Sequence, residues 1–247
     1  MFKEKDLELI EDGERLNKII EGFIRKKAYK KDAMHILEAG CGRRWPFQLE
    51  GINYILTGVD MDKAALDIRK NKLSDLHESI EGDLCSLDLG VDRFDVIYCS
   101  YVLEHIENAD VVLNNFVKWL KPNGIIIINV PDPDSVHGFI TRITPHWFHV
   151  FFYRFVEGKK NAGKPGYAPY PTYYNPVISR KGMRSFCNDE DTNVVLEAEY
   201  GGAFFRPGKG ALKPLIYIIK KIINIISIGF LSSKHSSLLY ILSKRVV

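Results

Sequence analysis

Two glycines and several carboxylates stand where apolar strands are predicted to end, and their spacing could bind a ligand. Residues 36–42, Ile-Leu-Glu-Ala-Gly-Cys-Gly, run from an apolar strand through Glu38 to Gly40 and Gly42. Glycine leaves room for a ligand beside the backbone and permits φ angles closed to other residues. A carboxylate at a strand end, such as Asp60, can accept hydrogen bonds from both hydroxyls of a ribose. These residues predict a nucleotide-type cofactor site.

The spacing of the glycines bears on which cofactor this is. A dinucleotide fingerprint requires Gly-x-Gly-x-x-Gly, but the last position, counted from Gly40 and Gly42, is Trp45. The segment instead resembles motif I of the class I S-adenosylmethionine (SAM)-dependent methyltransferases, an acidic residue followed by Gly-x-Gly-x-Gly, with Arg44 in place of the last glycine. A nicotinamide or flavin dinucleotide is therefore disfavoured.

The segments that follow resemble the same family in order. Residues 55–62 are predicted to form a second strand that ends in Asp60, with Asp62 placed to cap a helix. Residues 80–84, Ile-Glu-Gly-Asp-Leu, resemble the family's third strand end, where an Asp accepts from the adenine amino group and an apolar neighbour packs on the ring. Residues 94–106 resemble the fourth strand and the segment after it, which flanks the methionine part of SAM.

On this resemblance, which covers residues 34–131, the sequence is identified as a member of the class I methyltransferases. The cofactor that the resemblance implies is SAM, with S-adenosylhomocysteine as the product. The cofactor-binding residues that it implies are Glu38, Ala39, Gly40, Cys41, Gly42, Asp60, Met61, Asp83, Leu84, Cys99, Ser100, Tyr101 and His105.

The elements that must position these residues alternate between strands and helices. Helical spacing at 111–120, a Lys-Pro-Asn-Gly turn at 121–124 and the Ile-rich strand 125–130 match the family's fifth helix-strand unit. Apolar runs with almost no alternation are typical of a parallel sheet covered on both faces. With further strands at 194–200 and 238–245, we expect an α/β, Rossmann-like fold: a doubly wound, mostly parallel seven-stranded sheet with helices on both faces and an antiparallel last strand.

Length and composition agree with a single domain over residues 1–247, which the resemblance implies is a methyltransferase domain. With 46% hydrophobic and 26% charged residues, the chain can bury a full core. The net charge of +3 comes from dispersed Lys and Arg residues, so nucleic acid is not an expected partner. The 4 cysteines include no Cys-x-x-Cys pair, which argues against a zinc site and fits a reduced compartment.

Residues 1–30 predict a charged, amphipathic helical cap rather than a signal peptide. We therefore expect a cytoplasmic protein. Packing on the sheet is the expected role of this helix, and a flap over the cofactor is the alternative. The apolar side of the helix is formed by Leu9, Leu16, Ile19, Ile20 and Phe23.

Residues 132–176 lie where this fold places its acceptor-binding insertion, and they are unusually aromatic. Four phenylalanines at helical spacing predict one stripe, for which packing onto the domain is the expected role and ligand contact the alternative: Phe148, Phe151, Phe152 and Phe155. Four tyrosines in a Gly/Pro-rich loop could line a cleft for an aromatic or sugar ligand, or anchor the loop: Tyr167, Tyr170, Tyr173 and Tyr174.

The same insertion holds three candidates for a general base, His137, His146 and His149. Methyl transfer to oxygen is an in-line displacement on an activated sulfonium, so the enzyme must align the acceptor and remove its proton. Histidine suits that task near pH 7. His146-x-x-His149 also fits a metal pair, but no third ligand is evident, so we expect no metal.

A second addition, residues 205–235, precedes the last strand and predicts an apolar amphipathic helix. Lys220, Lys221 and Asn224 interrupt residues 212–231, so a membrane span is not expected. The apolar arc is wider than packing on one sheet face requires. Three alternatives stay open: a helix at the membrane interface, which would place the protein on the inner face of the membrane, a dimer contact, or a helix buried under the aromatic insertion.

These observations predict a SAM-dependent methyltransferase that acts on oxygen of a small or lipid-linked acceptor. The insertion resembles those of methyltransferases among bacterial surface-glycan enzymes, which makes a sugar or glycolipid the first expectation and a quinone or phenol the second. Arg44 in place of the third glycine motivates an alternative, a non-catalytic protein of this fold that binds a partner or a membrane. A nicotinamide-dependent oxidoreductase is the least favoured reading.

Overall fold

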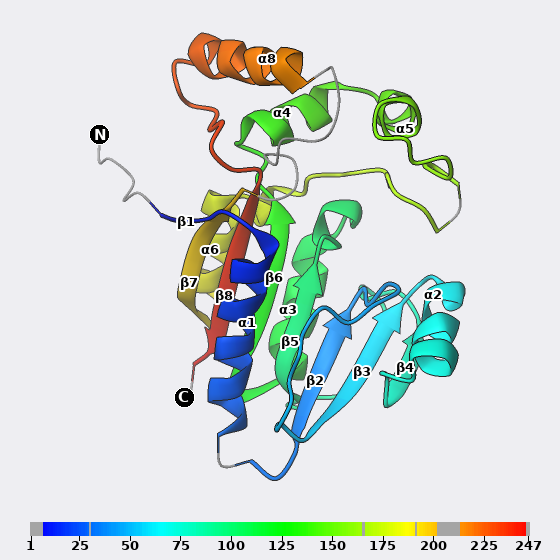
Figure 1. The fold of residues 1–247 in the computed structure, drawn as a ribbon. Coiled ribbons are helices and arrows are strands. Elements are labelled where there is room, and N and C mark those ends of the chain that lie inside the picture. Colours follow the sequence, from blue (N-terminus) through cyan, green and yellow to red (C-terminus); the bar gives the residue numbers. More distant parts are fainter. Residues whose placement is uncertain (1–6, 30, 165, 191, 202–212, 246–247) are drawn as a thin grey trace.

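The computed structural model describes residues 7–29, 31–164, 166–190, 192–201 and 213–245. Its strands form one eight-stranded sheet in the order β1-β7-β8-β6-β5-β2-β3-β4 (Figure 1). The strands are β1 (Glu8–Ile10), β2 (Met34–Ala39), β3 (Tyr54–Asp60), β4 (Glu78–Glu81), β5 (Phe94–Ser100), β6 (Leu120–Pro131), β7 (Thr192–Tyr200) and β8 (Ser237–Lys244). The α-helices are α1 (Gly13–Ala28), α2 (Lys63–Asp67), α3 (Ala109–Trp119), α4 (Val136–Ile143), α5 (His146–Phe155), α6 (Arg180–Asp189) and α8 (Lys213–Ile226).

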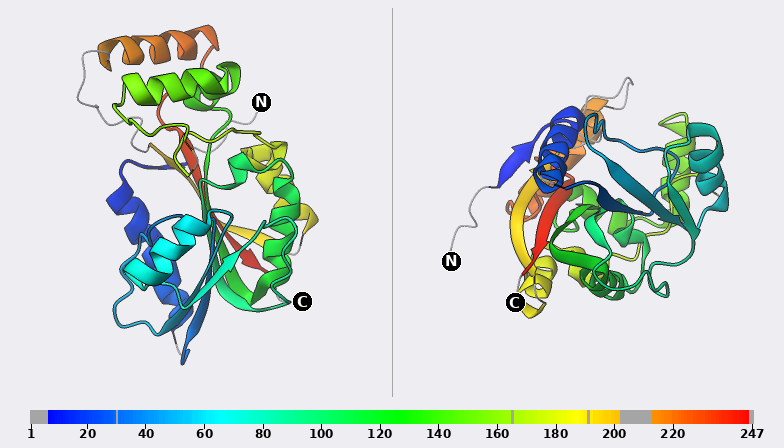
Figure 2. Two further views of the ribbon diagram at one scale, coloured as in Figure 1. Left: turned by 90° about the vertical axis from the view of Figure 1, so that its right-hand side faces the viewer. Right: turned by 90° about the horizontal axis from the view of Figure 1, so that it is seen from below.

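The strand directions confirm the predicted fold class. β8 runs antiparallel to β6 and β7, whereas the other described strand pairs are parallel. Helix α1 covers one face of the sheet, and α3 and α6 cover the other (Figure 2). The sheet therefore has the doubly wound, mostly parallel arrangement that the sequence predicts, with one strand more than expected.

The additional strand lies in the region predicted as a helical cap. Leu9 belongs to β1, which pairs with β7 at the edge of the sheet, so its assignment to the helix is wrong. The helix begins only after Asp12, whose carboxylate accepts a hydrogen bond from the Arg15 backbone N–H at 2.8 Å. Aspartate is a favoured N-cap because it satisfies a free N–H of the first turn. The buried side chains of α1 pack against the sheet, as expected for the structural role: Leu16, Ile20 and Ile24.

The two additions to the fold lie together, beyond the carboxyl ends of the parallel strands (Figure 1). Helices α4 and α5 follow β6, and α8 precedes β8. Helix α8 lies alongside α4. None of the helices in the described part of the chain is both long and apolar enough to cross a membrane.

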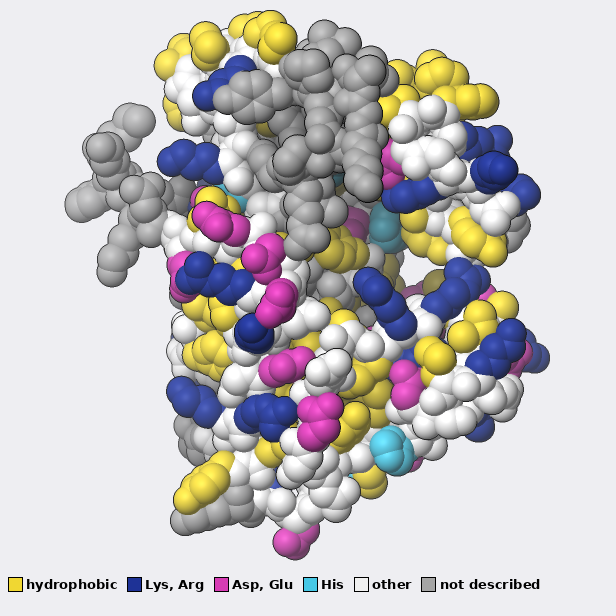
Figure 3. Space-filling view, in the orientation of Figure 1, with side chains coloured by type: hydrophobic (Ala, Val, Ile, Leu, Met, Phe, Trp, Pro, Cys, Tyr) yellow, Lys and Arg dark blue, Asp and Glu magenta, His cyan; other side chains and the backbone are white. Residues whose placement is uncertain are grey.

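The aromatic stripe on α5 does not pack onto the domain as expected. No residue of α5 is buried, and Phe148, Phe151 and Phe155 are exposed. On α8, the described Ile222 and Ile226 are exposed as well, so this end of the helix is not buried under the insertion. Figure 3 shows apolar side chains at the surface of this end of the molecule. Helical spacing predicted the stripe but not what it would contact.

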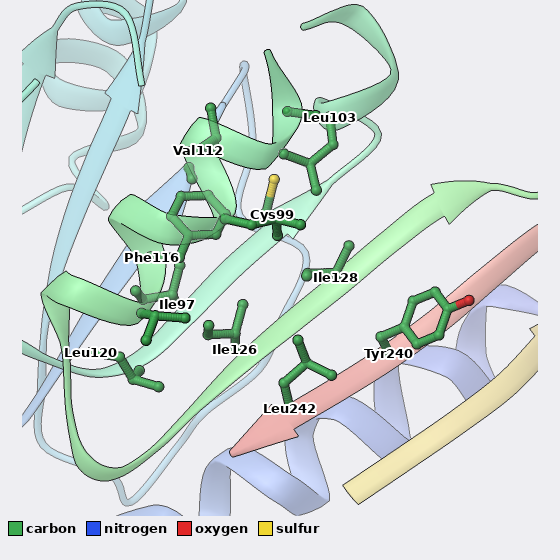
Figure 4. Packing of buried hydrophobic residues seen from close by; sticks show 14 of the residues in the cluster. Ile97, Cys99, Leu103, Val112, Phe116, Leu120, Ile126, Ile128, Tyr240 and Leu242 are labelled. Carbon is green, nitrogen blue, oxygen red and sulfur yellow. The ribbon is translucent and has the colours of Figure 1, made fainter. Parts of the chain in front are cut away.

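The core explains why β5 and β6 lack alternation in sequence. Ile126 and Ile128 contact α3 side chains such as Phe116, whereas Ile125 and Ile127 belong to the cluster beneath α1 (Figure 4). Both faces of these strands are therefore buried, and burial of each such side chain contributes roughly 1.5–3 kcal/mol. The segment predicted as a Lys-Pro-Asn-Gly turn falls within β6, where the pairing shifts register and Asn123 takes a φ of 63°.

Candidate active site

The carboxyl ends of four parallel strands bring the predicted cofactor residues to one edge of the sheet. Gly40 follows β2, Met61 follows β3, Asp83 follows β4 and Tyr101 follows β5. Strands β3 and β5 flank β2, so the chain order reverses between β2 and β5. Ligands of doubly wound sheets bind in the crevice at such a switch point.

The two glycines of the loop after β2 are required for different reasons. Gly40 has a φ of +69°, and a Cβ atom there would lie 2.2 Å from the Val102 side chain. Gly42 has a φ of +54°, and open space surrounds the position of its absent Cβ. Gly40 therefore lets this loop approach the segment after β5, whereas Gly42 keeps the space above the loop free for a ligand.

Asp60 is held at the end of β3 by two backbone donors. Its Oδ2 accepts from the Gly42 N–H at 2.8 Å, and its Oδ1 accepts from the Asp62 N–H at 2.8 Å. Asp62 caps α2 as predicted, because its carboxylate accepts from the Ala64 N–H at 3.0 Å. The Asp60 carboxylate thus lies beside the glycine loop, where a ribose hydroxyl can reach it.

The Glu38 side chain is not exposed to a ligand; it supports the glycine loop through Arg69. It is buried, and its Oε2 accepts from Arg69 Nη2 at 2.8 Å. Arg69 also donates to the Cys41 carbonyl at 2.7 Å and pairs with Asp75 at 2.8 Å. Burial raises the pKa of Glu38, and the Arg69 hydrogen bond opposes that rise. No local spacing indicates the contacts of Arg69 with the loop, because Cys41 and Glu38 lie 28 and 31 residues away along the chain.

The other predicted cofactor residues divide by exposure. The side chains of Ala39, Cys41 and Cys99 are buried in the core, so only their backbone is available to a cofactor. Leu84 is buried next to the exposed Asp83. Four other side chains are exposed or half-buried at the edge of the sheet and are therefore accessible to a cofactor: Met61, Ser100, Tyr101 and His105.

The turn after β5, Leu103–His105, joins this edge to the tyrosine loop, the loop that carries Tyr167, Tyr170, Tyr173 and Tyr174. The Glu104 carbonyl accepts from the Tyr173 N–H at 2.8 Å. His105 Nδ1 lies 2.6 Å from the Pro171 carbonyl oxygen. The ring of His105 contacts the ring of Tyr170, with centroids 5.5 Å apart. Burial lowers the pKa of His105, which favours its neutral form.

Glu104 is a buried carboxylate that sequence reasoning missed. Its side chain is buried, and its Oε2 has no hydrogen-bond partner among the described residues. Burial raises the pKa of Glu104 to about 8. A carboxyl group in such surroundings is protonated near neutral pH and can donate a hydrogen bond. The only sequence signal for Glu104 was its position in residues 94–106, the segment that resembles the family's fourth strand and the residues after it.

Arg43, and not Arg44, joins the glycine loop to the insertion. Arg43 pairs with Asp62 at 2.9 Å, donates to the Gly166 carbonyl and lies 5.3 Å from the Tyr167 ring centroid. Arg44 is exposed. Among the tyrosines, Tyr167 and Tyr170 therefore serve the anchoring role that the sequence left open.

A cavity of about 390 Å³ lies between α4, α5 and the tyrosine loop. His146 and His149 line it, whereas His137 is not among its lining residues. The remaining lining residues carry hydroxyl, aromatic or basic groups, apart from one proline: Thr141, Arg142, Thr144, Pro171, Thr172, Tyr173 and Tyr174. The structure thus brings together two of the three candidate bases with two of the four tyrosines.

His149 is hydrogen-bonded through Nε2 to Thr144. Thr144 Oγ1 lies 2.6 Å from His149 Nε2 and 2.7 Å from the Ile140 carbonyl oxygen, and when its proton goes to that carbonyl, Oγ1 accepts from His149 Nε2–H. The Nδ1 of neutral His149 is then an acceptor and can take a proton. Burial, and next the nearby His146, lower the pKa of His149.

A second cluster of charged groups holds the ends of β6, β7 and β8 together. His235 is buried, with Nε2 2.6 Å from Asp132 Oδ2 and Nδ1 3.1 Å from Glu199 Oε2. Arg180 pairs with Glu199 at 2.7 Å. Although burial opposes it, the hydrogen bonds to Asp132 and Glu199 raise the pKa of His235. The same contacts lower the pKa of Asp132, and they lower the pKa of Glu199 to about 2.

We expect this cluster to make the free energy of unfolding depend on pH. The contribution of His235 is complete below its unfolded pKa of about 6.5 and is lost as pH rises through the higher folded value. The contributions of Asp132 and Glu199 are complete above their unfolded pKa values of about 4 and are lost as pH falls. In urea denaturation from pH 5 to 9, His235→Gln should flatten the decline of stability above pH 6.5, and an unchanged decline would contradict the assignment.

The glycine loop, the Asp60 carboxylate and the switch point lie together at one edge of a sheet that has the class I methyltransferase fold. A family model described as a methyltransferase domain matches residues 37–128. Residues 37–128 therefore match a methyltransferase domain, and the fold of the chain is that of the class I SAM-dependent methyltransferases, whose methyl donor is SAM.

Individual relatives agree with this family at moderate similarity. The chain is similar to a ubiquinone biosynthesis O-methyltransferase of Rickettsia bellii, with 32% identity over 47% of this chain and 49% of that protein. It is also similar to phosphoethanolamine N-methyltransferase 3 of Arabidopsis thaliana, with 29% identity over 42% of this chain and 24% of that protein. The matches thus span half or less of the length of these curated relatives.

A solved structure extends the similarity of fold to most of the chain. A SAM-dependent methyltransferase from Mesorhizobium loti superposes with a TM-score of 0.54 and 15% identity, covering 90% of this chain and 96% of that one. At this identity the agreement concerns the fold.

Proposed function

We propose that this protein transfers the methyl group of SAM to an oxygen atom of a small or lipid-linked acceptor. The observation that carries the proposal is the cavity lined by His146 and His149. The tyrosine loop on one side of that cavity hydrogen-bonds to Glu104, at the edge where the cofactor residues meet. A donor at the sheet edge and an acceptor in the cavity would therefore be neighbours.

The lining of the cavity supports a hydroxylated acceptor. The hydroxyls of Thr172 and Tyr173 can exchange hydrogen bonds with sugar hydroxyls, and the tyrosine rings can stack on a sugar or a phenol. The hydroxyls of Thr141, Thr144 and Tyr174 are hydrogen-bonded to other protein groups. We therefore place a sugar or glycolipid first and a quinone or phenol second. The similarity to a ubiquinone biosynthesis O-methyltransferase supports oxygen as the acceptor atom, whereas the similarity to phosphoethanolamine N-methyltransferase 3 does not.

The proposal is tested by incubating the protein with SAM and a panel of acceptors, and measuring S-adenosylhomocysteine by mass spectrometry. The panel should contain hydroxylated sugars, glycolipids and catechols, with amine acceptors as the comparison. Formation of S-adenosylhomocysteine that depends on a hydroxylated acceptor supports the proposal. Turnover only with amines, or none with SAM bound, would overturn it in favour of N-methylation or of a non-catalytic role.

Within this function, we place His149 as the general base. We expect His149→Gln to lower kcat by about 10²–10⁴-fold, the usual contribution of a positioned base, with SAM affinity unchanged. Because the pKa of His149 is lowered, the wild-type kcat should hold to a lower pH than an ordinary histidine would allow. His137→Gln is the matched control, since His137 belongs to the same insertion but does not line the cavity. Equal kcat in His149→Gln and wild type would refute this role.

A further inference from the structure

Exposed apolar side chains gather at the end of the molecule that carries α5 and α8 (Figure 3). Of the 23 exposed large apolar side chains that the structure describes, 15 lie in residues 143–173 and 218–230. We call the following set the α5–α8 face: Trp147, Phe148, Phe151, Phe155, Ile218, Ile222, Ile225, Ile226, Ile228 and Phe230. Large exposed apolar patches on a protein commonly mark a site that binds another protein or a membrane.

The spacing within each helix makes the face continuous along it. Trp147, Phe151 and Phe155 are four residues apart on α5, and Phe155 is 72% exposed. Ile218, Ile222, Ile225 and Ile226 follow the helical period on α8, and Ile226 is 75% exposed. Residues at such spacing share one side of a helix, so each helix presents an apolar side to its surroundings.

The charge around this face differs in sign from that of the rest of the chain. Residues 136–164 and 213–234 contain 9 Lys and Arg residues and a single acidic residue, Glu157. Glu157 is itself paired with Lys159 at 2.7 Å. The remainder of the chain contains 25 Lys and Arg against 30 Asp and Glu residues. The overall net charge of +3 therefore conceals a strongly basic end on an otherwise acidic protein.

We infer that the α5–α8 face docks on an anionic membrane surface, with its apolar side chains at the boundary between headgroups and acyl chains. Aromatic and isoleucine side chains next to lysine and arginine are typical of helices that lie in that boundary. A second copy of the chain is a poorer fit, because two copies of a basic end would repel each other. His146 and His149, which line the cavity, lie on the opposite side of α5 from Phe151 and Phe155, so docking would place the cavity behind this helix, close to the membrane surface. That last point rests on the proposed function, and it favours a lipid-linked acceptor over a soluble one.

The experiment is sedimentation of the whole protein with vesicles of phosphatidylcholine, alone or mixed with phosphatidylglycerol. We expect binding to the mixed vesicles that weakens as salt is added. We expect two paired variants, Phe151→Glu with Phe155→Glu and Ile225→Glu with Ile226→Glu, each to weaken binding by about tenfold or more. Each pair removes two apolar side chains that would enter the membrane and adds two negative charges that the anionic lipids repel. Val91→Glu is the matched control, because Val91 is an exposed apolar residue outside the α5–α8 face.

Folding and the proposed function are kept separate by titrating each variant with SAM. Paired variants that bind SAM as the wild type does but no longer sediment with the mixed vesicles support the inference, whether or not any acceptor is turned over. The inference would be overturned if the wild-type protein did not sediment with the mixed vesicles, or if the paired variants bound these vesicles as tightly as Val91→Glu does. A dimer in light scattering that both paired variants dissociate, without vesicle binding, would assign the face to a second copy instead.

Discussion

Replacing Arg69 with alanine is expected to lower the free energy of unfolding by about 3 to 5 kcal/mol, the usual cost of removing one partner of a buried ion pair. Arg69 is fully buried, with Glu38 at 2.8 Å and the Cys41 carbonyl at 2.7 Å. Without the guanidinium, the Glu38 carboxylate loses its buried cation and the glycine loop loses a support. Urea denaturation followed by circular dichroism measures the effect.

Two further variants test this interpretation. Lys70 is exposed beside Arg69, so Lys70→Ala should change stability by no more than about 0.5 kcal/mol. Arg69→Met combined with Glu38→Gln should recover part of the loss, because neither side chain then leaves a charge buried alone. A loss in Arg69→Ala that is no larger than in Lys70→Ala would show that the pair does not hold the loop.

Replacing Asp60 with alanine is expected to weaken SAM binding by about 1 to 3 kcal/mol through the loss of charge-assisted hydrogen bonds to the ribose. Asp60 also accepts from the Gly42 N–H, so its removal loosens the loop that contacts the cofactor. Calorimetric titration with SAM measures the change. Asp67→Ala is the control, since Asp67 is exposed at the far end of α2. Unchanged affinity in Asp60→Ala would mean that the ribose lies elsewhere.

The parts of the fold that the sequence predicted correctly rest on local signals or on the resemblance to the family. The isoleucines of β6 indicated burial on both faces, and they divide between two core clusters. Asp62 indicated a helix start, and its carboxylate caps α2. The antiparallel last strand was predicted by resemblance to the family, and β8 has that direction. Periodicity and capping depend on neighbouring residues, which is why one sequence reveals them.

The parts that the sequence did not predict depend on contacts between distant segments. Glu38 lies 31 residues from Arg69, and Asp132 lies 103 residues from His235, so no local spacing indicates either contact. Strand β1 has three residues, too few to show a period. The stripe on α5 was correctly placed on one side of a helix, but helical spacing does not say whether that side meets the core or solvent.

The same distinction applies to the candidate site. The resemblance placed Gly40, Asp60, Asp83 and Tyr101 at strand ends, and parallel strands necessarily bring such ends to one edge. It did not reveal that Gly40 makes room for Val102, because that contact joins two separate loops. The cavity likewise depends on how α4, α5 and the tyrosine loop meet, which no local pattern encodes.

Calorimetric titration of the purified protein with SAM and with S-adenosylhomocysteine, with NADH as the control, shows directly which cofactor the protein binds. We expect micromolar binding of both adenosyl ligands at one site, and no binding of NADH. Binding of NADH in place of SAM would contradict the assignment of the cofactor. Failure of both adenosyl ligands to bind would mean that the edge formed by the glycine loop and Asp60 does not hold SAM, and would favour the non-catalytic alternative.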